Sequence, residues 1–310
     1  MTRPATDIAA SVRARLLRHA TARGEDFELV LTRYANERLL HRLTKSAHAG
    51  QFVLKGATLF TIWTGEPHRA TRDVDLLGFG DPSVGAVRAM FRDILAVDVG
   101  EDGVRFDEKT FRVALIREEQ TYGGVRVVVH ARIATAVVRL QFDVGFGDAV
   151  TPAAMEVEVP ALLDVPPLRL RAYPRETVIA EKIEAVVQLG LANSRMKDFY
   201  DLAVLARGFD YDGDLLVRAI RATFERRRTP LPLDPTAGLT SAFYDDHGKQ
   251  QQWRAFLRKT GARDIADLAD AVAVVSGFLA RPLEVAARGQ PWTAQWPAGG
   301  PWREMRLDQP

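Results

Sequence analysis

The stretch Asp73-Val74-Asp75-Leu76-Leu77 decides the expected fold, because it combines the pattern of a β-strand with a pair of acidic side chains. Its apolar residues predict a strand buried in a sheet. Side chains two positions apart on a strand point to the same face, so Asp73 and Asp75 are expected to project together, with α-carbons about 6.5–7 Å apart. Two carboxylates about 4 Å apart repel by about 4 kcal/mol at an effective dielectric constant of about 20, and a divalent cation removes that cost. The alternative is a solvent-facing strand edge whose acids suppress aggregation.

A third acid, Asp143, lies in a second strand-like stretch, Arg139–Val144, in which apolar and polar residues alternate. Asp143 is on the polar face of this stretch. If the strand lies beside the one that carries Asp73 and Asp75, the three carboxylates form a metal-binding cluster. In two-metal chemistry such a third acid positions or deprotonates an attacking hydroxyl. The alternative is an ordinary solvent-exposed strand acid.

A glycine turn precedes the acid pair along the chain. The run Lys55-Gly56-Ala57-Thr58 predicts a strand-to-helix turn. Gly56 allows backbone N–H groups to approach a phosphate, and Thr58 can donate its hydroxyl to the same phosphate. Without a phosphate ligand, the same run is an ordinary turn.

Basic residues lie between this turn and the acid pair. Arg69 and Arg72 are candidates to offset the charge of a triphosphate, or alternatively to form salt bridges with neighbouring acids. We expect His68 to be a loop residue. A second basic group, with Arg226, Arg227 and Arg228 in sequence, is typical either of a phosphate-attracting surface or of a solvated helix end.

Lys182 is the most informative residue of the second half of the chain. On a helical projection it falls within the apolar stripe of the predicted helix 176–189. A buried ammonium group needs a partner, which is either a carboxylate or a bound triphosphate, unless the side chain reaches out to solvent. Asp198 and Asp201, one turn apart on the next predicted helix, 194–206, are candidate partners.

Composition excludes several classes of protein. The 310 residues fit two domains, and a hydrophobic content of 47% is too high for a disordered chain. Cysteine is absent, so disulfides and thiolate zinc sites play no part, and a cytosolic location is expected. The longest apolar runs are too short to cross a membrane. The formal net charge of +2 excludes a general polycation.

The pattern of elements predicts an α+β fold in two domains. Residues 1–165 are expected to form a mixed α/β domain with N-terminal helices that break near Gly24. Its sheet begins at Asp73 and continues as an antiparallel ladder over 104–150, with a further strand at 155–159. A proline-rich hinge follows, and residues 166–310 are expected to be α-helical.

Five motifs, taken in order, resemble the AbiEii/AbiGii toxin family of nucleotidyltransferases, which includes the MenT toxins. They are Lys55-Gly56-Ala57-Thr58, the stretch 69–76 around the acid pair, the stretch 142–148 around Asp143, Glu181-Lys182-Ile183, and the stretch 195–202 that contains Asp198 and Asp201. The resemblance spans residues 50–205. Each motif is weak alone, and their order and spacing make the set specific.

The resemblance implies a polymerase-β-like nucleotidyltransferase core with a helical C-terminal domain. In the family the paired acids bind magnesium and the glycine-led turn holds the triphosphate, which here are Asp73, Asp75 and Gly56. A lysine like Lys182 and an acid like Asp198 are needed for activity. Family members are bacterial toxins of type IV toxin–antitoxin systems, some of which protect against phage, and characterised relatives transfer nucleotides to the ends of transfer RNA. Ala57 stands where many relatives have Gly or Ser, so nucleotide preference transfers less securely.

We therefore expect a cytoplasmic, magnesium-dependent toxin that moves a nucleoside monophosphate from an NTP to an RNA 3′ end, with tRNA as the favoured acceptor and a cognate antitoxin as partner. The metal, in a two-metal site, is assigned to Asp73, Asp75 and Asp143. Two alternatives are an enzyme that modifies a protein or small-molecule hydroxyl, and a non-catalytic binding module on the same fold.

Overall fold

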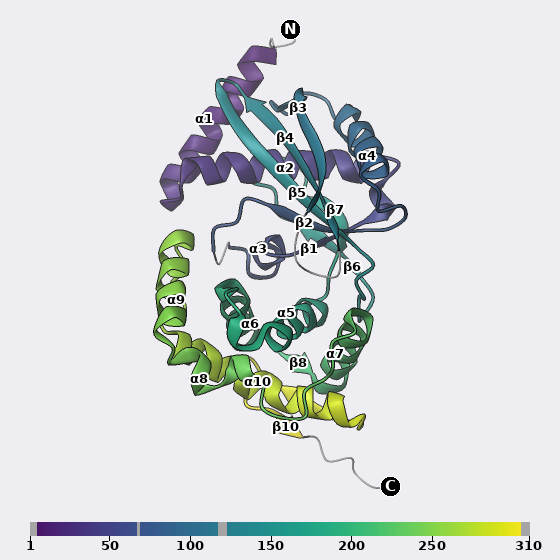
Figure 1. Ribbon diagram of the computed structural model, residues 1–310. Coiled ribbons are helices and arrows are strands. Elements are labelled where there is room, and N and C mark those ends of the chain that lie inside the picture. The colour runs from purple at the N-terminus through teal and green to yellow at the C-terminus, as the bar shows by residue number, and fades with distance from the viewer. Residues whose placement is uncertain (1–4, 67–68, 117–122, 305–310) are drawn as a thin grey trace. The chain divides into compact units, whose positions relative to one another are not determined.

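The computed structural model describes residues 5–66, 69–116 and 123–304, and its chain divides into two units (Figure 1). The first unit comprises Met1–Gly147 and Met155–Ala172. The second comprises Asp148–Ala154 and Tyr173–Pro310, so the chain passes between the units more than once. The first unit therefore extends past residue 165, through one further strand.

The first unit is built on a seven-stranded mixed sheet in the order β3-β4-β5-β2-β1-β7-β6. The strands are β1 (Phe52–Lys55), β2 (Val74–Gly78), β3 (Arg105–Ile116), β4 (Gly124–Ile133), β5 (Ala136–Phe146), β6 (Met155–Val159) and β7 (Leu168–Ala172). The predicted antiparallel ladder is present as β3, β4 and β5. Its connection to β2 is parallel, because a helix and a hairpin return the chain before β5 in the direction of β2.

The strand β7 is a correction to the expected helical second half. Its sequence, Leu168–Ala172, alternates apolar and basic residues as a strand does, and it pairs with β1 in parallel and β6 in antiparallel. The prolines on either side of it favoured a hinge at the sequence level. Alternation over only five residues is a weaker indication of a strand than the flanking prolines are of a hinge.

The described part of the first unit also contains the helices α1 (Ala5–Arg23), α2 (Phe27–Lys45), α3 (Thr58–Thr64) and α4 (Val84–Ala96), with a short 3-10 turn at Ala49–Gln51. The expected break near Gly24 is confirmed, since this glycine has a φ of +64° and Asp26 caps α2 by accepting a hydrogen bond from the Leu29 amide. The core lies where α4 meets the apolar face of the sheet. There the Phe91 ring meets Phe52 of β1 and Phe142 of β5 edge-on, with centroids 5.8 and 5.9 Å apart.

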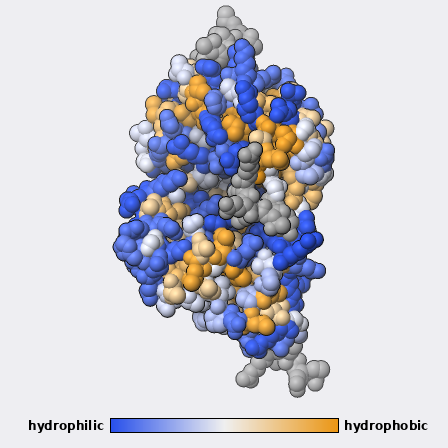
Figure 2. Space-filling model, viewed as in Figure 1, coloured by the Kyte–Doolittle hydropathy of each residue, from blue (hydrophilic) through white to orange (hydrophobic). Residues whose placement is uncertain are grey.

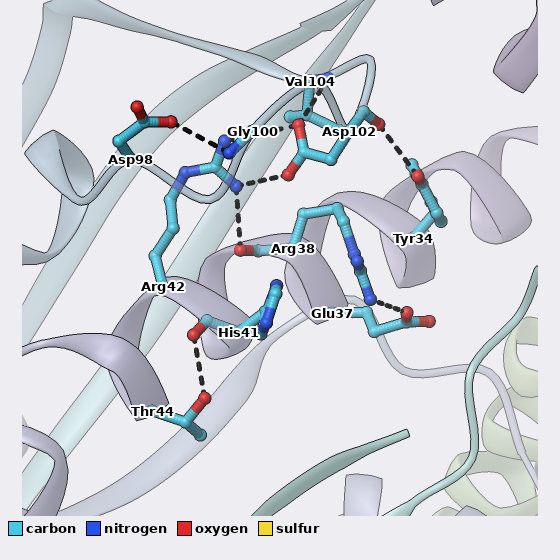
Figure 3. A network of polar contacts seen from close by, with 10 residues as sticks. All are labelled: Tyr34, Glu37, Arg38, His41, Arg42, Thr44, Asp98, Gly100, Asp102 and Val104. Carbon is cyan, nitrogen blue, oxygen red and sulfur yellow. Dashed lines mark hydrogen bonds and ion pairs between the residues drawn. The ribbon is translucent and has the colours of Figure 1, made fainter. Parts of the chain in front are cut away.

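Buried charges on α2 fasten loops to this core (Figure 3). The Arg42 guanidinium donates to both carboxylate oxygens of Asp102, at 2.6 and 3.3 Å, and to the Arg38 carbonyl at 3.0 Å. The Tyr34 hydroxyl donates to the Asp102 carbonyl at 2.9 Å. Glu37 pairs with Arg38 and accepts a hydrogen bond from a loop amide, while burial raises the pKa of its carboxyl. Such paired charges fix geometry more than they add stability.

The second unit is mainly helical, as expected. Its helices are α5 (Arg175–Leu189), α6 (Met196–Gly208), α7 (Gly213–Arg227), α8 (Ser241–Tyr244), α9 (His247–Thr260) and α10 (Leu268–Arg288), with short 3-10 turns at Gly190–Ala192 and Ala237–Leu239. A small sheet of β8 (Tyr211–Asp212), β9 (Ala294–Trp296) and β10 (Arg303–Glu304) was not predicted. Its strands are too short for sequence periodicity, and aromatic packing of Phe278 against Trp296 and Trp302 holds them. The α+β class of the whole chain is confirmed.

Candidate active site

The acid pair lies at the start of β2. Asp75 is within the strand and half-buried, whereas Asp73 immediately precedes it and is exposed. Val74 is fully buried on the opposite face, so the predicted strand pattern holds. The start of β2 is also anchored from α2, because the Asn36 side-chain amide donates to the Arg72 carbonyl at 3.0 Å. Asn36 therefore fixes the backbone beside Asp73, a role that its position in a helix did not suggest.

A row of four charged residues crosses the sheet at this point. The register pairs Lys55 of β1 with Asp75 of β2, Asp75 with Asp143 of β5, and Asp143 with Arg126 of β4. All four side chains therefore share one face, in the order positive, negative, negative, positive. The predicted adjacency of Asp75 and Asp143 is thus present in the sheet. The two flanking cations offset the repulsion between the central acids.

Arg126 binds both carboxylate oxygens of Asp143. The Arg126 Nε and Nη2 atoms donate to Asp143 Oδ1 and Oδ2, each at 2.8 Å. Bidentate pairs of this kind are among the strongest hydrogen-bonded contacts in proteins. The Asp143 side chain is 20% exposed, so solvent weakens the pair only in part. Sequence reasoning missed Arg126, although its place on the polar face of an alternating strand was a usable signal.

Gln141 connects the third acid to the acid pair. Its Nε2 atom lies 3.1 Å from Asp73 Oδ2 and 3.4 Å from Asp143 Oδ2, and it donates to both. Its Oε1 atom accepts from two nitrogens of Arg139, each at 3.2 Å. The carboxylates of Asp73 and Asp143 therefore share a single donor. Gln141 is buried, and its position two residues before Asp143 put it on the same face in the sequence pattern.

These residues fit a magnesium ion held by two carboxylates. Magnesium takes one or two protein carboxylates and completes its shell with water and substrate phosphates, which matches Asp73 and Asp75. Over residues 5–66, 69–116 and 123–304, no group of three or more acids and histidines is arranged to hold a metal. A metal at Asp143 would compete with Arg126 for this carboxylate, because each of its oxygens accepts a hydrogen bond from Arg126.

Gly56 brings the predicted phosphate turn against Asp75. Its φ of +77° lies in the left-handed region, which glycine adopts without strain. A Cβ at this position would come within 2.1 Å of Asp75 Oδ2. Any side chain would therefore displace the carboxylate. Ala57 and Thr58 follow at the start of α3, both half-buried.

The two arginines predicted to offset phosphate charge, Arg69 and Arg72, differ in exposure. Arg69 is half-buried and Arg72 is exposed, while the carbonyl of Arg72 is held by Asn36. His68, expected to be a loop residue, lies outside the described residues.

Lys182 and Asp198 come together in the second unit. The Lys182 ammonium donates to Asp198 Oδ1 at 2.9 Å and to Asp201 Oδ2 at 2.8 Å, and Arg195 Nε donates to Asp198 Oδ2 at 2.7 Å. Both acids are fully buried. Burial alone would raise the pKa of Asp198, but the attraction of Lys182, Arg195 and Lys197 outweighs it and holds that pKa below its usual value. Of the partners considered for Lys182, the structure shows carboxylates.

The basic end of α7 is not a solvated surface throughout. Arg227 is largely buried and donates to Glu184 at 2.8 Å and to Asp148 at 3.2 Å, with Glu181 at 3.5 Å. Burial opposes its charge, but these three acids raise the pKa of Arg227 above its usual value. Asp148 and Glu181, which both lie in the motifs quoted above, therefore share one structural partner.

Comparison with known proteins places the chain. A model of the family described as nucleotidyl transferase AbiEii toxin, type IV TA system, matches residues 38–274. Two solved structures from Helicobacter pylori, that of JHP933 and that of a candidate nucleotidyltransferase, are each 11% identical with a TM-score of 0.48, and the matches cover 85% of this chain and 94% and 96% of theirs. No curated protein matches the sequence. None of the described helices is long and apolar enough to span a membrane. On the face of the molecule shown in Figure 2, apolar and hydrophilic residues intermingle. The family model covers well over half of the chain, so the protein belongs to the AbiEii family of nucleotidyl transferase toxins of type IV toxin–antitoxin systems.

Proposed function

We propose that this enzyme transfers a nucleoside monophosphate from an NTP to the 3′ hydroxyl of an RNA, with tRNA as the acceptor, and so blocks translation. The observation that carries the proposal is the charged row at the start of β2. Asp75 and Asp143 are neighbours in register, and Asp73 shares the Gln141 donor with Asp143. Family membership supplies the reaction class, and the motif resemblance supplies the acceptor.

The acids are proposed to hold the metal. Asp73 and Asp75 would bind magnesium, and Asp143 would complete the set for a second ion. When bound, magnesium supplies positive charge that offsets the triphosphate and the developing charge on the pyrophosphate. The phosphates would rest on the turn that begins at Lys55 and Gly56, against which Asp75 already packs.

The transfer itself makes one bond and breaks another. The 3′ oxygen of the acceptor bonds to the α-phosphorus, the bond from that phosphorus to the bridging β-oxygen breaks, and pyrophosphate leaves with the electron pair. Asp143 would accept the hydrogen bond, and then the proton, of the attacking hydroxyl. Asp143 is suited to this role because its register partner on β2 is Asp75, a candidate metal ligand, so that the two carboxylates lie side by side.

The remaining candidate residues would bind the phosphates, offset their charge or position another side chain. The N–H of Ala57 and the hydroxyl of Thr58 would bind phosphate oxygens. Arg69, Arg72 and Lys182 would offset phosphate charge. Asp198 would fix Lys182, to which it is hydrogen-bonded at 2.9 Å. We further propose that the enzyme acts in the cytoplasm and that a cognate antitoxin restrains it, since type IV toxins have such partners.

The direct test is incubation of purified protein with total RNA, magnesium and each α-labelled NTP in turn. We expect labelled RNA with one NTP or few. The variant Asp75→Asn should lose this labelling while its circular dichroism spectrum and melting temperature stay close to those of the original protein. The control Asp234→Asn makes the same chemical change at an exposed position of the second unit and should label RNA normally.

Two results would overturn the RNA acceptor. Label that resists ribonuclease and migrates with protein would indicate a protein acceptor, and label in a small molecule would indicate that alternative. Full labelling by Asp75→Asn would overturn the assignment of the metal site.

A further inference from the structure

We propose that the face of β3, β4 and β5 beside the candidate active site binds the phosphate backbone of the RNA acceptor. This inference rests on the proposed function for the identity of the acceptor. The surface, called the basic strip below, consists of six residues: Arg105 and Arg112 of β3, Arg126, His130 and Arg132 of β4, and Arg139 of β5.

The strand register places the basic strip on the same face as Asp143. Arg126 is the partner of Asp143, and positions that differ by two on each strand share that face. His130 of β4 is accordingly the register partner of Arg139, which lies four residues before Asp143 on β5. The register of β3 brings Arg112 opposite Val128 and Arg105 opposite Arg132, so both belong to the same face.

The strip places basic residues directly opposite one another on neighbouring strands. Arg105 and Arg132 are direct cross-strand partners, and His130 and Arg139 are another basic pair. Like charges opposite one another destabilise a sheet. Acids at paired positions of this face include Asp75 and Asp143 in the charged row, where Arg126 holds Asp143, and Asp107, whose carboxylate accepts the Lys109 amide at 3.0 Å. An external anion would relieve this repulsion.

The basic strip is exposed to solvent, and its positive charge is concentrated on one face. Arg105, Arg112, Arg132 and Arg139 are exposed, and the Arg126 side chain is 40% exposed. The whole chain carries a net charge of only +2, so a concentration of arginine on one face is not a by-product of a basic composition.

The strip is also continuous with the reacting groups. Arg139 donates to Gln141, which donates to Asp73 and Asp143. At about 3.4 Å per strand residue, Arg139 lies about 14 Å along β5 from Asp143. An RNA whose 3′ hydroxyl reaches Asp143 would therefore lay its preceding phosphates along the strip, toward the pair of Arg105 and Arg132. Arginine is suited to this, since its guanidinium binds phosphate in a bidentate manner.

The test measures RNA binding without catalysis. The full-length protein, in EDTA and without NTP, is titrated against a 5′-labelled single-stranded RNA at several salt concentrations. We expect the double variant Arg105→Gln/Arg132→Gln to bind more weakly and to reduce the slope of log K against log salt by about 1.4, because each lost phosphate contact on single-stranded RNA contributes about 0.7. These two residues lie outside the proposed metal and nucleotide sites.

The control is Arg92→Gln/Arg169→Gln. It removes the same charge at exposed positions of the same unit, on α4 and β7, away from the strip. The control should bind RNA with the slope of the original protein. Asp75→Asn should also keep its RNA affinity while losing transfer, which separates failure of the strip from failure of the proposed chemistry.

An unchanged affinity and slope in the strip variant would overturn the inference, as would an equal loss in the control. An original protein that binds no RNA, yet labels a protein or small-molecule acceptor, would also overturn it while leaving nucleotidyl transfer intact.

Discussion

At the scale of single residues, Gly56 is constrained by both its backbone and its neighbour. Gly56→Ala must place a Cβ within 2.1 Å of Asp75 Oδ2 while keeping a φ of +77°. Gly65 at the end of α3 has a φ of +79° but nothing within 4 Å of its Cβ position. Gly65→Ala should therefore cost only the backbone strain, about 1 kcal/mol of the free energy of unfolding. Gly56→Ala should cost more and abolish transfer, as judged by urea unfolding and the labelling assay.

The two glycine variants share nearly the same backbone strain, so their difference isolates the contact with Asp75. Equal losses of stability, with transfer retained in both, would show that Asp75 is not held against the turn in the active protein.

Arg126 has a separate consequence at this scale, because it competes with a metal for Asp143. Arg126→Met should lower the free energy of unfolding in EDTA by about 1 kcal/mol, a value discounted for the 40% exposure of its side chain. Magnesium should restore more stability to this variant than to the original protein, since it would neutralise the freed carboxylate. Melting temperatures across a magnesium titration check this. A variant whose response to magnesium matches that of Arg139→Met would contradict it.

Sequence reasoning reached the acids at this scale but not their partners. Asp75 and Asp143 could be predicted to share a face, because alternation along each strand is readable in the sequence. The pairing of Asp143 with Arg126 could not, because it depends on the register of two strands, which the sequence sets only through packing. The sequence places Gln141 on the correct face, but its donation to both Asp73 and Asp143 depends on how β2 and β5 pair.

At the scale of elements, α5 and α6 are joined by the triad of Lys182, Asp198 and Asp201. Lys182→Met would leave two fully buried carboxylates without this cation, which costs about 3–5 kcal/mol for a broken buried pair. Lys197→Met, at an exposed position on α6, is the control and should cost little. Chemical unfolding followed by tryptophan fluorescence measures both. A small loss for Lys182→Met would mean that α5 and α6 do not depend on the triad.

The same triad gives an acid dependence. The folded-state pKa of Asp198 is lowered from its usual 3.8, so its contribution to stability is fully present above that value and is lost as the pH falls through the lower native value. Asp198→Asn should therefore be less stable at neutral pH and lose less further stability below about pH 4. Parallel curves for the two proteins, from unfolding measured at successive pH values, would contradict this assignment.

Element prediction succeeded for helices with a long apolar pattern and for the short strands β2 and β6, and it failed for β7 and for the small sheet. The helices α5 and α6, expected over 176–189 and 194–206, each supply many residues to a repeating pattern, and their positions are confirmed. β7 and the three strands of the small sheet are five residues or fewer, and pairing with distant strands defines them. Tertiary contacts therefore define β7 and the small sheet.

At the scale of the whole molecule, the candidate residues are divided between two units. Asp73, Asp75 and Asp143 belong to the first, and Lys182 and Asp198 to the second. Hydrogen exchange of the full chain can show which unit responds to nucleotide. With magnesium and an NTP at about 100 times the dissociation constant, binding stabilises the folded state by about 2.7 kcal/mol. We expect slower exchange first at the amides after Lys55 and along β2 and β5, because the proposed phosphate and metal ligands lie there.

Asp75→Asn provides the comparison for this last experiment, since it removes one proposed metal ligand and leaves the strand otherwise unchanged. It should lose the magnesium-dependent part of the protection in the first unit. Protection that appears only in the second unit, or that persists in Asp75→Asn, would place nucleotide binding away from the charged row on β1, β2, β5 and β4. Additional protection in α5 around Lys182 would support its proposed part in offsetting phosphate charge. Unchanged exchange in α5 would limit Lys182 to joining α5 to α6, the structural role that its hydrogen bonds to Asp198 and Asp201 already show.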